Sequence, residues 1–170
     1  YTVWYDGLAT VDAVKVKPVL NIKLKQFTVQ IDNNIIVLLG KTSVADNYIL
    51  KDNWGRYYTV TEVGYLEIGT DIVMLTVPGE LIPQLVYGNV VDKTQSYLGT
   101  DWELEYTSEL VAENKTVLVM GLCNDAIGYI VPDNDYSSSG AEGHYEETVS
   151  TGSRSATAIS KALLTANKRL

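Results

Sequence analysis

The chain has 170 residues, a formal net charge of −8 and a pI of about 4.6. This length fits one domain with a sizeable core, and the acidity argues against nucleic acid as a partner, because phosphate binding needs clustered lysine and arginine. No apolar run reaches the length of a membrane span. The single cysteine, Cys123, leaves no internal disulfide and no cysteine-based zinc site, and we expect it to be a buried, inert thiol.

The first part of the chain predicts mainly β-structure. Residues 1–13 carry aromatic side chains without a clear period, which suits either an edge strand or a segment that packs on something outside this chain. Residues 14–31 alternate and predict one long strand or a bent pair. Their apolar phase slips between Leu24 and Phe27, as a β-bulge or a twist that exchanges the faces would explain. The lysines of this region are expected on its solvent face: Lys15, Lys17, Lys23 and Lys25.

Two further apolar segments follow. Residues 35–39 come after a capping-type Asp-Asn-Asn and precede a glycine, which favours a short buried helix with a glycine C-cap over a buried strand. Residues 59–68 and 72–77 flank a Gly-Thr-Asp turn and predict a hairpin whose second strand is buried on both faces. Residues 81–87 then suit a short helix that opens near Pro83 and stops at a glycine.

The second half of the chain predicts one more strand and a long helix. Residues 89–115 are polar and predict a loop or irregular hairpin, whereas residues 116–123 predict a second buried strand. Residues 133–143 have the composition of a flexible surface loop. The best helix signal is residues 155–170, with an apolar stripe and with basic residues that suit its C-terminal dipole: Ala156, Ile159, Leu163, Ala166, Lys168 and Arg169. Together these segments predict an α/β or α+β fold with a mixed sheet, buried central strands, flanking helices and a C-terminal helix.

Two side chains of ligand type stand just after the predicted buried strands. Pro78-Gly79 ends the first strand and delivers Glu80 at its carboxyl end, where open α/β sheets bind ligands. Tyr129 follows the second strand. Each also suits a simpler interpretation, as an exposed turn carboxylate and a sheet-surface tyrosine. The single histidine, His144, has no evident nucleophile beside it, which favours an exposed loop histidine over a catalytic base.

Three blocks of the sequence, read in order, resemble the C-terminal part of the catalytic domain of neutral/alkaline non-lysosomal ceramidases. They are the segment that ends in Thr-Val-Pro-Gly-Glu80, the segment Gly-Leu-Cys-Asn-Asp-Ala-Ile-Gly-Tyr129-Ile, and His-Tyr145-Glu-Glu. The likeness covers roughly residues 59–165 and includes bacterial members of the family. It implies that the chain is a single domain over residues 1–170 and the C-terminal portion of a larger zinc hydrolase, an interpretation that Tyr1 in place of a first methionine also favours.

The resemblance also implies a chemistry. The family holds zinc with two histidines from its N-terminal half, a glutamate and a tyrosine, so Glu80 and Tyr129 would be the two zinc ligands of this chain. Tyr145 would stabilise the oxyanion. The expected substrate is an N-acyl-sphingosine or a related lipid amide, or another small amide or ester, and an extracellular or cell-surface setting is suggested. Because the two histidines have no counterpart here, we expect the chain to need the missing N-terminal half as its partner and to be inactive alone. The alternative is a non-catalytic binding or assembly domain that retains only the scaffold.

Overall fold

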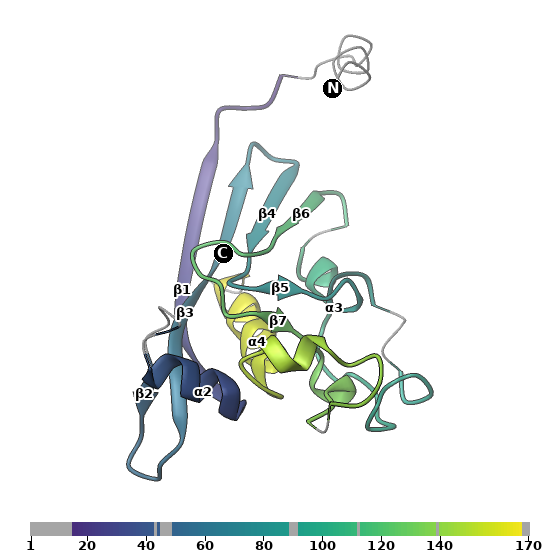
Figure 1. Cartoon of the computed structure of the whole chain (residues 1–170). Coiled ribbons are helices and arrows are strands. Elements are labelled where there is room, and N and C mark those ends of the chain that lie inside the picture. Colours follow the sequence, from purple (N-terminus) through teal and green to yellow (C-terminus); the bar gives the residue numbers. More distant parts are fainter. Residues whose placement is uncertain are drawn as a thin grey trace, which may run out of the picture.

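The computed structural model of the chain (Figure 1) describes residues 15–42, 44, 49–88, 92–111, 113–138 and 140–167. The prediction for residues 1–13 and the basic helix end at Lys168 and Arg169 lie outside these described residues.

The fold is a mixed α/β fold, as the sequence predicts. Its strands are β1 (Leu20–Ile31), β2 (Leu50–Lys51), β3 (Tyr57–Ile68), β4 (Ile72–Thr76), β5 (Glu80–Leu81), β6 (Thr116–Met120) and β7 (Tyr129–Ile130). Its α-helices are α2 (Asn34–Lys41), α3 (Gln84–Tyr87) and α4 (Ser155–Asn167). In the described part of the chain there are also three short 3-10 helices: η1 (Thr107–Leu110), η2 (Asp133–Asp135) and η3 (Glu146–Val149). No helix in the described part of the chain is both long and apolar enough to cross a membrane.

The main sheet has the order β1-β3-β4-β6, with β2 added beside β3 (Figure 1). The β3–β4 hairpin that the sequence predicts is confirmed, and β1 also runs antiparallel to β3, whereas β6 pairs with β4 in parallel. A separate two-stranded parallel sheet joins β5 to β7. This small sheet follows directly from β4, because only Val77, Pro78 and Gly79 separate β4 from β5.

Strand β1 contains no bulge. Its register with β3 is unbroken from the pair Leu20–Ile68 to the pair Ile31–Tyr57, so the bulge interpretation is wrong. The phase slip instead marks a change of face. Successive side chains of a strand point to opposite faces, so a shift of one residue moves the apolar positions from one face to the other. The apolar side chains at the start of β1 therefore lie on one face of the sheet, and those at its end, from Phe27 onward, lie on the other face.

One face of the main sheet is covered by α4, which packs against β1 and β3. The apolar stripe predicted for this helix is confirmed, and its residues join the core together with buried side chains of the strands: Ala156, Ile159, Leu163, Ala166, Val29, Val63, Tyr65, Val73 and Leu75. Lys23 and Lys25 are on this side as well. They are half-buried, and the Lys23 ammonium stands over the Tyr65 ring, so the prediction of a solvated lysine face is wrong for these two.

The opposite face of the main sheet is apolar and exposed to half-exposed in the described structure. We call it the apolar sheet face, and the strand registers align its members across all four strands: Leu20, Ile22, Leu24, Leu66, Ile68, Ile72, Met74, Leu118 and Met120. Leu24 is 57% exposed and Leu118 is 42% exposed. The predictions that β4 is buried on both faces and that β6 is buried are therefore wrong, because β4 buries one face only and the inner side chains of β6, Val117 and Val119, are half-buried.

The two shorter helices form where the sequence predicts them. Helix α2 starts at the Asn33 N-cap, whose Oδ1 accepts the Ile35 N–H at 3.0 Å. Its glycine lies inside the helix and Thr42 caps the end, so the glycine C-cap is wrong, and only Val37 of this helix is buried. The Asn33 amide also donates to the carbonyls of Glu147, Thr148 and Ser150, which fastens η3 to the start of α2.

Candidate functional site

The Pro78–Gly79 turn is held in place by the loop that follows β6. The Glu80 N–H donates to the Gly128 carbonyl at 3.0 Å, and the Ile127 N–H donates to the Pro78 carbonyl at 2.8 Å. A Cβ on Gly79 would lie 2.3 Å from the Gly128 oxygen, so the two backbones approach closely enough that only glycine fits. The sequence Pro-Gly-Glu thus ends β4 and attaches Glu80 to the strand that carries Tyr129.

The loop after β6 makes its turn through strained backbone. Leu122 and Asn124 have φ values of +53° and +68°, which residues other than glycine rarely adopt. The Asn124 amide donates to Glu62 Oε1 at 3.0 Å. Cys123, between them, is half-buried and outside β6, so the expectation of a buried strand cysteine is wrong. Such strain persists where the surroundings impose it, and it is concentrated at functional sites.

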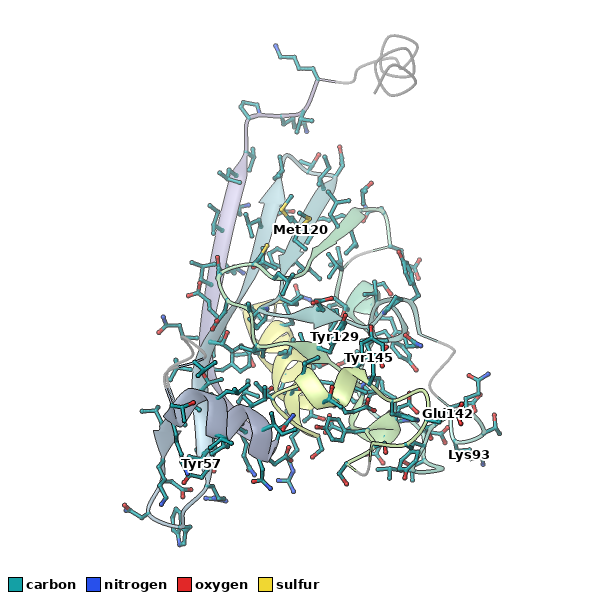
Figure 2. All side chains as sticks on the ribbon, viewed as in Figure 1. Tyr57, Lys93, Met120, Tyr129, Glu142 and Tyr145 are labelled. Atoms are coloured by element: carbon teal, nitrogen blue, oxygen red, sulfur yellow. The ribbon has the colours of Figure 1, made fainter. Side chains whose placement is uncertain are left out.

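The three side chains that the sequence singles out as site residues lie together. Glu80 and Tyr129 are direct partners in the parallel β5–β7 ladder, so their side chains leave the same face of that sheet. The Tyr145 hydroxyl lies 3.3 Å from the Tyr129 hydroxyl, and the two rings meet edge to face with centroids 5.8 Å apart. Figure 2 shows Tyr129 and Tyr145 side by side. Residues 80, 129 and 145 are far apart in sequence, and the turn at Pro78 brings them to one place.

The environment of Tyr129 favours its neutral form. The hydrogen bond with Tyr145, burial of the phenol, and the hydrogen bond and negative charge of Glu80 all raise the pKa of Tyr129 well above its ordinary value. The hydroxyl has a single proton and donates to one neighbour at a time. A neutral phenol oxygen that stands beside a carboxylate provides two oxygen ligands for a cation on one side of β5–β7.

An open cavity of about 770 Å³ lies beside this group. Its lining includes Glu80 and Tyr129 together with Asp135, His144 and Glu146. Among the lining residues in the described structure, carboxylates are the charged groups and lysine and arginine are absent. The cavity therefore favours cations and amines over anions by its electrostatic potential.

His144 is not the exposed loop residue that the sequence predicts. Its side chain is 21% exposed, and its Nδ1 lies 2.7 Å from Oε1 of Glu147, which is only 4% exposed. The loop of residues 133–143 also differs from the prediction, because it contains η2 and buries Tyr136 and Ser137. Glu147 is the residue that sequence reasoning missed. The available signal was a glutamate three residues after the single histidine, a spacing at which side chains on one helical turn meet.

Tyr136 gives this region a testable alkaline sensitivity. Burial, with the negative charges of Asp32 and Glu147, raises the pKa of Tyr136 to about 12. Since an unfolded tyrosine ionises near pH 10, the stability that this group contributes is complete below pH 10 and is lost as the pH rises toward 12. We expect Tyr136→Phe to make the fall in urea stability between pH 10 and 12 shallower. Tyr87→Phe, at an exposed tyrosine, should leave that fall as it is, and equal slopes in the three proteins would contradict the prediction.

The described residues do not supply a complete metal site by themselves. Within them, no three histidine, cysteine, aspartate or glutamate side chains lie close enough together to hold a metal ion. A carboxylate and a phenol oxygen are two of the four donors that a zinc ion needs, and the sequence contains one histidine, His144, in the lining of the same cavity. Comparison of the chain with protein-family models, with curated proteins and with solved structures finds no match in any of the three.

Proposed function

We propose that this chain is the C-terminal part of a zinc-dependent amide hydrolase that resembles neutral ceramidase. In this proposal Glu80 and Tyr129 are its zinc ligands and Tyr145 stabilises the oxyanion. The observation that carries the proposal is the pairing of Glu80 with Tyr129 across β5–β7, with the Tyr145 hydroxyl 3.3 Å from that of Tyr129. The support lies in the meeting, at one point, of three residues that the family likeness names separately.

Bound at this pair, zinc would polarise the amide carbonyl and lower the pKa of a bound water toward neutrality. The chain's own residues have the remaining tasks. Glu80 supplies a carboxylate and Tyr129 a phenol oxygen on one side of the small sheet. Tyr145 is exposed and reaches the same point, so its hydroxyl can donate to the oxygen that becomes negative when the carbonyl is attacked. The acidic lining of the cavity suits a substrate that releases an amine.

The proposed partner is the N-terminal half of the catalytic domain, which would bring the two histidines. The apolar sheet face supports such a partner. Four strands present aligned apolar side chains there, and exposed apolar patches of this extent mark interaction surfaces. Strand β1 also supports a partner on this face, because apolar Leu24 lies on the uncovered side of the sheet and charged Lys23 lies on the side toward α4. A strand orders its apolar side chains toward the layer that covers it.

The second candidate is a non-catalytic domain that binds or assembles through this same face. The observation that favours it is again the apolar sheet face, which serves assembly whether or not chemistry occurs nearby. The two candidates differ in their dependence on Glu80 and Tyr129. Assembly through the sheet does not need them, whereas zinc-dependent hydrolysis does.

Zinc titration by calorimetry tests the ligand assignment. We expect the chain alone to bind zinc weakly and its complex with the N-terminal half to bind one zinc tightly. The double variant Glu80→Ala, Tyr129→Phe should weaken the complex's zinc affinity about 100-fold or more, because it removes half of the donors. Tyr87→Phe, at the edge of the same cavity, is the matched control and should bind zinc as the wild type does. If the complex with the double variant still binds one zinc tightly, the assignment of Glu80 and Tyr129 as ligands is wrong.

A further inference from the structure

The cavity beside Glu80 and Tyr129 has a second polar centre, the pair His144–Glu147. Glu147 is almost completely buried, and its Oε1 accepts the Ser137 N–H at 3.1 Å as well as contacting His144 Nδ1 at 2.7 Å. The Tyr97 ring meets the imidazole edge to face, with centroids 5.0 Å apart. A flexible surface histidine needs no such support. The imidazole is therefore held in one orientation by a buried carboxylate and by an aromatic ring.

The contacts of Glu147 favour Nδ1 as the donor nitrogen of the ring. A backbone N–H can only donate, so the Ser137 contact identifies Oε1 of Glu147 as an acceptor. When Glu147 is a carboxylate, this oxygen has no proton to donate, and His144 Nδ1 carries the proton in the contact between them. In neutral imidazole the other nitrogen, Nε2, is left with a free lone pair, and in the described structure it has no hydrogen-bond partner. His144 lines the same cavity as Glu80 and Tyr129.

We propose that His144 is a further catalytic residue of the hydrolysis proposed above, on which this role rests, and that Glu147 is its positioning residue. His144 Nε2 accepts a proton from the attacking water as the bond forms between the water oxygen and the carbonyl carbon. The imidazolium then gives that proton to the amide nitrogen as the carbon–nitrogen bond breaks. One amide and one water become one carboxylic acid and one amine, and His144 returns to its neutral form. Glu147 holds the tautomer and balances the transient charge.

The geometric part of the proposal can be measured on the chain as it is. Because His144 is the only histidine, the imidazole ¹⁵N signals in an NMR spectrum belong to it without ambiguity. We expect the neutral ring to be the Nδ1–H tautomer, and we expect Glu147→Gln to shift the population toward Nε2–H. A predominant Nε2–H tautomer in the wild type would overturn the positioning role. This readout does not depend on zinc or on activity.

The catalytic part is tested in the zinc-loaded complex with the N-terminal half. The two substrates are a fatty-acid amide of an alkylamine, which needs a proton on its leaving nitrogen, and the matching p-nitrophenyl ester, which does not. His144→Asn keeps a donor toward Glu147 but removes the Nε2 position. This variant should lower kcat for the amide about 100-fold or more. The fold-loss in kcat for the ester should be at least ten times smaller. Glu147→Gln should show the same amide-selective loss in smaller measure.

The outcomes separate this role from the proposed function. Equal losses on amide and ester in His144→Asn would contradict proton donation to the leaving nitrogen and would overturn the inference alone, because only the amide needs that step. An unchanged amide rate would overturn it as well. A wild-type complex that hydrolyses neither substrate would overturn the proposed function and this role with it, even if the NMR tautomer is the expected one.

Discussion

Gly128→Ala is expected to lower the free energy of unfolding by about 3 kcal/mol or more and to displace Tyr145 from Tyr129. Gly128 has a φ of +86°, which favours glycine, and a Cβ there would lie 1.8 Å from the Val149 carbonyl oxygen. That atom belongs to the backbone, so it cannot rotate out of the way. To make room, η3 must move, and Tyr145 moves with it. Urea denaturation measures the loss, and zinc titration of the complex measures the damage to the site.

The matched control for this prediction is Gly143→Ala. Gly143 has a similar φ of +83°, but a Cβ there meets nothing within 4 Å. Alanine at this position carries only the backbone cost of a left-handed residue, about 1 kcal/mol. The two glycines have similar φ values, but only Gly128 is crowded by a neighbouring atom. The comparison therefore separates the cost of crowding from the cost of φ. Losses of equal size in the two variants would show that the contact with Val149 does not restrict the site.

Leu24→Glu is expected to leave the chain folded but to reduce its affinity for the N-terminal half about 100-fold or more. Leu24 is 57% exposed on the apolar sheet face, so a carboxylate there stays in water while the chain is alone. Once another layer covers the face, the same carboxylate is buried without a partner, which costs about 3 kcal/mol or more. Isothermal titration of the two halves measures the affinity, and urea denaturation checks that stability changes by less than about 0.5 kcal/mol.

The control for the docking prediction is Leu38→Glu on helix α2. Leu38 is 61% exposed and receives the same substitution, but it belongs to a helix and not to the apolar sheet face. Its affinity for the N-terminal half should equal that of the wild type. If Leu24→Glu also binds like the wild type, the apolar sheet face is not the docking surface. If both variants lose affinity equally, surface charge rather than burial is responsible.

Several elements follow from local sequence because their causes are local. Asn33 caps α2 through a hydrogen bond two residues away, and Pro78-Gly79 ends β4 because proline lacks a ladder donor. The stripe on α4 has the helical period and predicts its buried face. The hairpin of β3 and β4 follows from a turn between two apolar runs. In each case the residues that determine the element are within it or beside it.

What the local pattern does not contain is which side of a strand is covered. Alternation in β1 is compatible with either face being inward, because the period of two is the same for both, and the continuous apolar run of β6 favours neither face. The positions of the other strands and of α4 decide it, and they put Leu24 outward and Lys23 toward the helix. The same is true of Cys123, which sequence reasoning buried in a strand and which lies half-buried in the turn after β6.

The sequence by itself determined the order of the longer strands and helices and the strand end that precedes Glu80, and with the family resemblance it named three site residues: Glu80, Tyr129 and Tyr145. Only the tertiary structure decided that these three meet, because their meeting depends on a parallel pairing between segments far apart in the chain. It also decided the surroundings of His144. A surface histidine and a supported one have the same local sequence, and the difference is a buried carboxylate whose burial depends on the packing of η3, α2 and the loop at Ser137.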